Sequence, residues 1–301
     1  MKKLQYKLMA LSTLWRGFLA RLSPRPRRTP PKDTSPHIIL LTGAAGRVAT
    51  LIRPLLAQTY PLMRLSDCRP VTDLAVNEEF QRADLTDPHA VQRAVAGVKG
   101  IVHLGALADE SEFDRLFAVN MAGTVNLFEA ARRHGVSRIV FASTLHVLGF
   151  YERDKPLSPD SPPRPDSRYA ISKLFGENLG RLYADKYGLR VCCLRIGHAM
   201  ATRDRAVPGI WIGPLDLVAL IRIGLEHPEL HYEIFHAVAE YTGIDLGQDR
   251  ARDVYGWICR EPGGDYATAQ AGITRWFPDD PIAQRVRGGE FASSTWESMR
   301  G

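Results

Sequence analysis

Tyr169 and Lys173 are the residues whose types and spacing most clearly suggest catalysis. Four residues apart on a helix, the two side chains share one face and lie one turn apart. A nearby ammonium group favours the charged form of a phenol, so we expect Lys173 to lower the pKa of Tyr169. Such a tyrosine can exchange a proton with a substrate hydroxyl. Because this spacing also occurs by chance in many helices, the interpretation depends on the rest of the chain.

Two hydroxyl side chains, Ser143 and Thr144, follow the apolar run 138–141. This places them at the carboxyl end of an expected strand, where open α/β sheets bind ligands. Thr144 could therefore hydrogen-bond the reacting oxygen of a substrate. The alternative is that it only stabilises the turn.

The segment 42–49, Thr-Gly-Ala-Ala-Gly-Arg-Val-Ala, follows one expected strand and opens an expected helix. In this context Gly43 permits a tight turn, and Gly46 lets the backbone approach a pyrophosphate at the helix N-terminus. Ala49 replaces the third glycine of the pattern, where helix and strand pack closely. A turn that binds no ligand is the alternative. The residues expected to contact a dinucleotide here are Gly43, Ala45, Gly46, Arg47 and Val48.

Asp67 ends the next expected strand, about 20 residues beyond the glycine turn, where an acid would hold the adenosine ribose. This favours NAD over NADP. Arg47 and Arg69 leave a site for the 2′-phosphate of NADP as the alternative. Further cofactor contacts are expected in two segments, 84–85 and 103–106, from Asp84, Leu85, Leu104, Gly105 and Ala106.

From residue 37 onward, short apolar runs alternate with helical patterns. Strands are expected at 37–41, 63–65, 100–104, 138–141 and 190–196, with a helix at 120–133. This alternation predicts an α/β fold with a Rossmann-type, doubly wound, mostly parallel sheet. We expect the dinucleotide-binding domain to span 37–200 and a smaller substrate-binding lobe with the C-terminal segment to span 201–301.

The composition is that of a globular protein, with 45% hydrophobic and 24% charged residues. The net charge is +6, but nine basic residues and one acidic residue precede His37. A nucleic-acid partner is therefore not expected, because its groove would need basic residues on the folded surface. Residues 1–36 read as a basic extension with a Pro-rich linker, too interrupted by charge to span a membrane. They either contact an anionic membrane surface weakly or form a disordered tail.

Four cysteines, Cys68, Cys192, Cys193 and Cys259, show neither metal-ligand spacing nor the density of a disulfide scaffold. We expect them to be reduced, small hydrophobic side chains in a cytoplasmic protein. No zinc or iron site is expected.

Taken in order, these motifs resemble those of the extended short-chain dehydrogenase/reductases, the NAD-dependent epimerase/dehydratase family. The shared set is Thr-Gly-x-x-Gly-x-x-Ala, Asp67, Asp84-Leu85, His-Leu-Gly-Ala, Asn120, Ser143-Thr144 and Tyr169-x-x-x-Lys173. The resemblance covers almost everything after His37. It implies a catalytic triad of Thr144, Tyr169 and Lys173. It also implies that Asn120 supports the site from a helix, that Ile196 contacts the cofactor, and that the protein forms a homodimer.

Within this family, segments 141–151, 194–197, 211–217 and 281–289 are most similar to uronate dehydrogenases, which oxidise C1 of a hexuronic acid to an aldarolactone. By this likeness Arg205, or else Arg203, would grip the carboxylate of the sugar. An exposed loop charge is the alternative. The chain differs from these enzymes at Ala108 and Leu145, where the similar enzymes carry polar side chains. A less polar substrate is therefore a second possibility. The residues expected to bind substrate are Ser143, Thr144, His146, Tyr169 and Arg205.

The sequence thus predicts an NAD-dependent oxidoreductase that acts on a hydroxyl of a small sugar acid, with Tyr169 as the general base. A nucleotide-sugar epimerase or dehydratase is the alternative enzyme. A non-catalytic NAD-binding sensor or scaffold is the alternative of another class.

Overall fold

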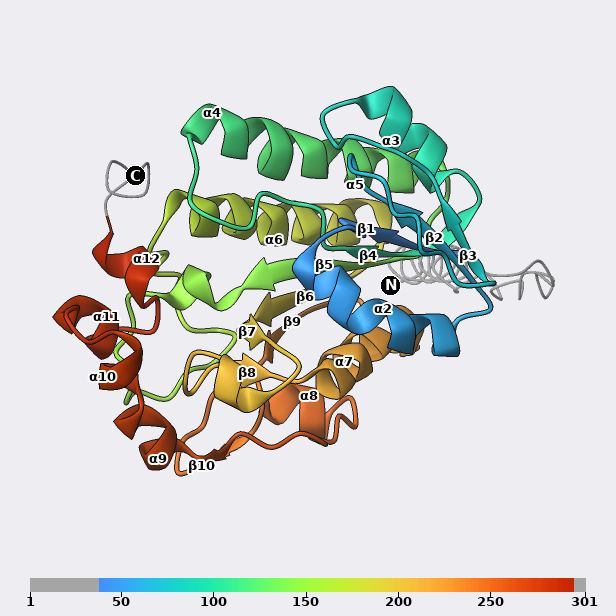
Figure 1. The fold of residues 1–301 in the computed structure, drawn as a ribbon. Helices are drawn as coiled ribbons and strands as arrows, with labels where there is room; N and C mark the ends of the chain where they lie inside the picture. The colour runs from blue at the N-terminus through green and yellow to red at the C-terminus, as the bar shows by residue number, and fades with distance from the viewer. Residues whose placement is uncertain (1–37, 295–301) are drawn as a thin grey trace, which may run out of the picture. The chain divides into compact units, whose positions relative to one another are not determined.

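A seven-stranded parallel sheet forms the centre of the protein (Figure 1). The computed structural model describes residues 38–294, and the predicted extension and linker at 1–36 lie outside this range. The strand order is β3-β2-β1-β4-β5-β6-β9, and each neighbouring pair is parallel. The strands are β1 (Ile38–Thr42), β2 (Leu62–Ser66), β3 (Glu78–Phe80), β4 (Val98–His103), β5 (Arg138–Thr144), β6 (Arg190–Ile196) and β9 (Tyr232–Ala237). This confirms the predicted Rossmann-type sheet.

Helices cover both faces of the sheet (Figure 1). Helices α2 and α7 contact each other on one face, while α5 contacts both α3 and α6 on the other. Each helix layer completes a separate apolar core with the strands. The helices are α2 (Arg47–Thr59), α3 (Pro88–Val95), α4 (Phe113–Leu116), α5 (Gly123–Arg133), α6 (Arg168–Tyr187) and α7 (Pro214–Glu226).

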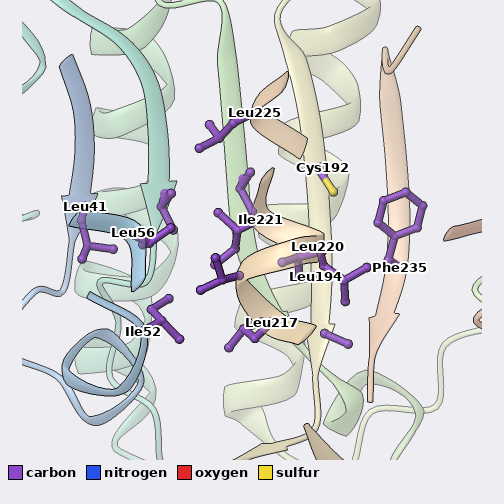
Figure 2. Close-up of a cluster of buried hydrophobic side chains, with 14 of the residues drawn as sticks. Leu41, Ile52, Leu56, Cys192, Leu194, Leu217, Leu220, Ile221, Leu225 and Phe235 are labelled. Carbon is purple, nitrogen blue, oxygen red and sulfur yellow. The ribbon is translucent and has the colours of Figure 1, made fainter. Parts of the chain in front are cut away.

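The core beneath α2 and α7 joins residues from distant parts of the chain (Figure 2). Ile52 and Leu56 of α2 and Leu217 of α7 lie with Leu41 of β1 and Leu194 of β6, all almost fully buried. These apolar positions recur at helical spacing on the helices, and the buried parallel strands are apolar on both faces. Burial of this surface supplies the main driving force for folding.

Two glycines allow helices to approach β5 from opposite faces. A Cβ on Gly176 of α6 would lie 2.2 Å from Cζ of Phe141. A Cβ on Gly224 of α7 would lie 2.6 Å from Cγ2 of Val140. The contact at Gly176 fixes the distance of α6 from the strand that ends at Thr144, and the contact at Gly224 does the same for α7.

Short elements follow β6, and β8, β10 and α9 contribute to a small apolar cluster that includes Leu145, Trp211, Tyr241 and Tyr266. Helix α7 and strand β9 also fall in the range predicted for the small lobe. Both belong to the main sheet and its core, however, because each buries its apolar residues there. The boundary at residue 200 therefore stays a prediction. The short elements are β7 (His198–Ala199), β8 (Trp211–Ile212), β10 (Tyr241–Thr242), α8 (Asp249–Asp253), β11 (Gly264–Asp265), α9 (Tyr266–Ala271), α10 (Ile273–Trp276), α11 (Pro281–Arg285) and α12 (Glu290–Ser293).

All four cysteines are free thiols, and Cys192 and Cys193 are buried in β6, which agrees with the expectation of small hydrophobic side chains. Between residues 38 and 294, no helix has the length and apolar character needed to cross a membrane.

Replacing Gly176 by alanine should destabilise the protein by about 1–3 kcal/mol, because the new methyl group overpacks the Phe141 ring. Helix propensity alone would favour alanine by about 1 kcal/mol, so the sign separates packing from propensity. Urea unfolding measures the change, with Asn178→Ala on the exposed side of the same helix as the control. Equal stability of Gly176→Ala and the wild type would contradict the close packing.

Candidate active site

The glycine turn between β1 and α2 lies directly against the loop after β4. Gly43 has φ +68°, and a Cβ on it would lie 2.7 Å from the backbone nitrogen of Gly105. The amide of Gly46 donates to the carbonyl of Gly43 at 2.9 Å, which tightens the turn. The bare backbone therefore leaves the helix N-terminus open to a phosphate group.

A buried hydrogen-bond network holds the same loop to β1. The hydroxyl of Thr42 lies 2.7 Å from Nδ1 of His103 and accepts from the amide of Gly105 at 3.2 Å. On its other side the imidazole lies 3.4 Å from the hydroxyl of Thr124 on α5. Burial lowers the pKa of His103 to about 3, and the charge of Lys173 acts in the same direction, so the ring is neutral.

Asp67 follows β2 and faces the glycine turn. Its carboxylate accepts from the amide of Ala45 at 3.0 Å and from the amide of Arg69 at 2.9 Å. The guanidinium of Arg69 donates to the carbonyl of Ala45 at 2.8 Å. An acid fixed beside a turn of glycine and alanine residues suits the ribose and pyrophosphate of NAD, so the residues present fit this cofactor.

The segment 84–85, where further cofactor contacts are predicted, makes mostly local contacts. The Asp84 carboxylate accepts from the amide and hydroxyl of Thr86, within its own turn. Leu85 lies between two elements, with its Cδ1 3.1 Å from the ideal Cβ position of Gly105 and its Cβ 2.8 Å from that of Gly123. Leu85 thus packs the loop after β4 against α5, and contact of either residue with cofactor stays a prediction.

A cavity of about 450 Å³ opens at the carboxyl ends of the strands, next to the glycine turn. It is lined by ten of the residues predicted for the site. These are Arg47, Val48, Leu104, Ala106, Ser143, Thr144, His146, Tyr169, Lys173 and Ile196. The fold therefore gathers predicted cofactor, catalytic and substrate residues around one space.

Tyr169 and Lys173 enter this cavity from the first turns of α6. The hydroxyl of Ser167 caps the helix by accepting from the amide of Ala170 at 3.1 Å. Nζ of Lys173 lies 5.9 Å from the Tyr169 ring centre and 5.2 Å from that of Phe141. Tyr169 is 8% exposed and Lys173 is 4% exposed.

The sequence analysis predicted a lowered pKa for Tyr169, and this prediction is wrong for the protein by itself. Burial raises the pKa of Tyr169 to about 12, while a hydrogen bond with Thr144 lowers it in part. Burial also lowers the pKa of Lys173 to about 8. Loss of solvation is the main cause of both shifts, because burial disfavours the charged form of each group.

Asn120 lies in a π-helical segment, Phe117–Ala122, between α4 and α5. Its side chain accepts from the amide of Leu107 at 2.8 Å and donates to the hydroxyl of Ser172 at 2.9 Å. The Ser172 hydroxyl donates to the carbonyl of Tyr169 at 2.7 Å. Asn120 therefore joins the loop after β4 to α6, the helix that carries Tyr169, and π-helical turns are frequent at functional sites.

Ser143 and Thr144 have different environments. Ser143 donates to the carboxylate of Glu177 at 2.6 Å, and that carboxylate is paired with Arg195 through two hydrogen bonds of 2.9 Å. The hydroxyl of Thr144 accepts from the amide of His146 at 3.3 Å. The sequence analysis missed the Glu177–Arg195 pair, because only the tertiary structure places α6 beside β6.

His146 has two partners that the sequence analysis also missed. Its Nδ1 lies 2.7 Å from the buried carboxylate of Asp166, and its ring lies 4.3 Å from that of Phe291. Asp166 comes from the loop before α6 and Phe291 from α12. The His–Asp pair fixes the orientation of the imidazole at the cavity wall.

The C-terminal segment closes one side of the cavity. Trp276, Phe277 and the run 287–291 all belong to its lining, although the sequence analysis assigned no site residue there. Arg205, predicted to bind substrate, is exposed on the turn Arg203–Arg205 and is not among the lining residues. Its role therefore stays a prediction.

The sequence of this chain is similar to a known protein family. Residues 39–212 match the model of the NAD dependent epimerase/dehydratase family. The chain belongs to this family. Membership confirms the resemblance drawn from the ordered motifs, and the NAD dependence of the family confirms the cofactor predicted from the glycine turn and Asp67.

Among members of this epimerase/dehydratase family, uronate dehydrogenases show strong similarity. The chain is 34% identical over 256 residues to the uronate dehydrogenase of Pseudomonas putida, covering 84% of this chain and 95% of that protein. It is 42% identical over 193 residues to that of Agrobacterium fabrum, covering 64% and 73%. A crystal structure of an Agrobacterium tumefaciens uronate dehydrogenase variant complexed with NAD has a TM-score of 0.77 at 35% identity, covering 86% of this chain and 98% of that one.

Gly43→Ala should weaken NAD binding at least about tenfold, since the methyl group would push the glycine turn away from Gly105. Gly97→Ala is the matched control, because Gly97 also has a positive φ, +76°, but nothing lies within 4 Å of its Cβ position. Both variants share a backbone strain of about 1–2 kcal/mol, but only Gly43 lies in the cofactor turn and against Gly105. Calorimetric titration with NAD measures the difference, and equal affinities would refute the role of the contact.

Lys173→Met should stabilise the protein at pH 7 by roughly 3 kcal/mol, because it removes a charge that burial disfavours. In the unfolded chain the lysine keeps its proton up to about pH 10.5. The cost in the wild type should therefore decrease as the pH rises from about 8 to about 10.5, and the two stabilities should converge.

Unfolding free energies of wild type and variant across this pH range measure the effect. Lys186→Met, at an exposed position near the end of the same helix, is the control and should show no such convergence. A pH-independent difference between wild type and Lys173→Met would contradict a buried, titrating lysine.

Proposed function

We propose that this protein is an NAD-dependent dehydrogenase that oxidises the C1 hydroxyl of a uronate-like sugar acid. The observation that carries this proposal is the single cavity at the strand ends. Thr144, Tyr169 and Lys173 line it together with Arg47 and Val48, the first residues of α2 after the glycine turn. A proton-transfer group and a dinucleotide cradle therefore face the same space, as hydride transfer from an alcohol requires.

Tyr169 is the proposed general base. Its phenolate oxygen accepts the proton of the substrate hydroxyl, and the hydroxyl of Thr144 hydrogen-bonds the same substrate oxygen. NAD, when bound, supplies the acceptor for the hydride and a positively charged nicotinamide ring. Because burial holds the pKa of Tyr169 near 12, the phenolate needs positive charge close by in order to form at neutral pH.

Lys173 would contribute part of this positive charge and also contact the nicotinamide ribose. Its own pKa of about 8 leaves it mostly protonated at neutral pH. Asn120 would act as a positioning residue, since its hydrogen bonds link the loop after β4 to the helix that carries Tyr169. His146, oriented by Asp166, would accept a hydrogen bond from a sugar hydroxyl.

The substrate class follows from the relatives named as uronate dehydrogenases. In a cyclic uronate, oxidation at C1 removes a hydride from carbon and a proton from the hydroxyl, which leaves a lactone. Ala108 and Leu145 line the cavity with apolar surface, and Leu145 also belongs to the apolar cluster around Trp211. We expect the pocket to make fewer polar contacts with the sugar hydroxyls than a fully polar site would.

We also propose a reducing, cytoplasmic location, on the ground that the cysteines are free thiols. Homodimerisation, weak contact of the extension at 1–36 with a membrane surface, and the absence of a nucleic-acid partner stay predictions from the sequence. The same holds for the division into a domain at 37–200 and a lobe at 201–301.

The activity test follows NADH absorbance with purified protein, NAD and a panel of galacturonate, glucuronate and neutral aldoses. We expect NADH formation with the uronates. Tyr169→Phe should lower kcat by about 10²- to 10⁴-fold, because it removes the general base. NAD affinity of the variant should change little, which a binding titration checks. Unchanged turnover in Tyr169→Phe would remove Tyr169 from the mechanism.

Net NADH formation also separates the proposed activity from the alternative enzyme class. A nucleotide-sugar epimerase recycles its cofactor within each turnover and releases no NADH. Epimerisation of a nucleotide sugar without NADH release, together with no NADH formation from free sugars, would favour that alternative. NAD binding without turnover of any tested sugar would favour the sensor class.

A further inference from the structure

Arg287 lies in the wall of the catalytic cavity with its guanidinium bonded only to neutral oxygens. It is 4% exposed and belongs to the cavity lining. Its hydrogen bonds go to the hydroxyl of Tyr266 at 3.1 Å and to the backbone carbonyls of Arg153 and Lys155. Nε has no hydrogen-bond partner among the described residues. A guanidinium normally recognises carboxylates with such donors.

Arg153 is a second buried guanidinium beside the first. Its Nε and Nη2 both donate to the carbonyl of Ala283, and its Nη1 has no partner in the described part of the chain. Burial and the charge of Arg287 both lower its pKa, to about 10. Asp154 is the carboxylate that acts electrostatically on Arg287, but it is exposed, and burial still lowers the pKa of Arg287.

Two like charges buried without a paired carboxylate cost free energy that folding must offset. Neither arginine loses its proton at neutral pH in ordinary protein surroundings. The cost falls if an anion binds in the cavity beside Arg287, where its charge offsets that of the guanidinium. Within residues 38–294, neither arginine forms an ion pair with an acidic side chain that could offset this cost.

The backbone places Arg287 beside the predicted sugar-binding histidine. Val286 bridges to Glu152, and the amide of Gly288 donates to the carbonyl of Gly149 at 2.8 Å. A Cβ on Gly288 would lie 2.0 Å from the carboxylate of Asp166, the group that orients His146. Arg287 is therefore one residue away from the His146–Asp166 contact, at the part of the cavity where a sugar would lie.

We propose that Arg287, with Arg153 behind it, forms the subsite that holds the carboxylate of the sugar acid. This rests on the proposed function and names the residue that selects an anionic substrate. It replaces Arg205 in that role, since Arg205 is exposed and outside the lining. The competing explanation is that Arg287 only ties the loop at 151–155 to the C-terminal segment.

Galacturonate and galactose separate these explanations, because they differ by a carboxylate in place of a hydroxymethyl group. Arg287→Gln removes the charge but keeps hydrogen-bond donors for Tyr266. We expect the ratio of kcat/KM for galacturonate to that for galactose to fall about 10- to 100-fold, mainly through KM. Arg287→Lys, which keeps the charge without the planar fork, should lower the ratio several-fold. Arg285→Gln is the control, an exposed arginine two residues away, and should leave the ratio unchanged.

Equal losses for both sugars in Arg287→Gln would assign Arg287 a purely structural role and overturn the proposal. An unchanged KM for galacturonate would overturn it as well, and a raised KM in Arg205→Gln would then return the role to Arg205. Thermal unfolding of each variant shows whether it folds. If Arg287→Gln does not, Arg287→Lys decides by the same ratio.

A binding measurement that needs no turnover separates this proposal from the activity. Galacturonate is titrated into Tyr169→Phe protein saturated with NAD, with and without Arg287→Gln. If galacturonate binding depends on Arg287 but the wild-type protein oxidises no uronate, the result would support the subsite and reject the proposed activity. Oxidation of galacturonate that is indifferent to Arg287 would keep the activity and reject the subsite. No binding of galacturonate at all would reject both.

Discussion

Direct backbone contact between the glycine turn after β1 and the loop after β4 is the constraint on which the site depends. Gly43 has a positive φ and no room for a side chain against Gly105. The contact lies where the sheet order reverses, because β1 is flanked by β2 on one side and by β4 on the other. Open α/β sheets form ligand crevices at such switch points. The buried Thr42–His103–Thr124 hydrogen bonds then hold the loop in place without adding charge.

Burial of Tyr169 and Lys173, the proposed catalytic pair, opposes stability and shifts the pKa values of both groups. Tyr169 and Lys173 are held where solvent stabilises neither charged form, which moves their pKa values in opposite directions. The close packing of Gly176 on Phe141 and the hydrogen bonds of Asn120 keep the helix in that position. In such a site a small amount of added positive charge has a large effect on the phenol, since the local dielectric constant is low.

The C-terminal segment gives the cavity its substrate-facing wall. It runs beside the chain at 149–153 and brings Arg287 and Phe291 to the same space as His146. Two buried arginines without an ion-paired acid are costly in a folded protein. A ligand anion that lowers this cost would couple substrate binding to the order of the segment.

The sequence by itself determined the parallel sheet and the cofactor turn, and it indicated the proposed catalytic pair. Glycine spacing, apolar periodicity and the four-residue interval of Tyr169 and Lys173 are local properties, so they could be read along the chain. The tertiary structure decided what depends on solvent exclusion and on contacts between distant segments. It reversed the expected pKa shift of Tyr169, joined β9 to the main sheet, and paired Glu177 with Arg195. It also brought Arg287 to the cavity, because burial and long-range packing leave no periodic signal in the sequence.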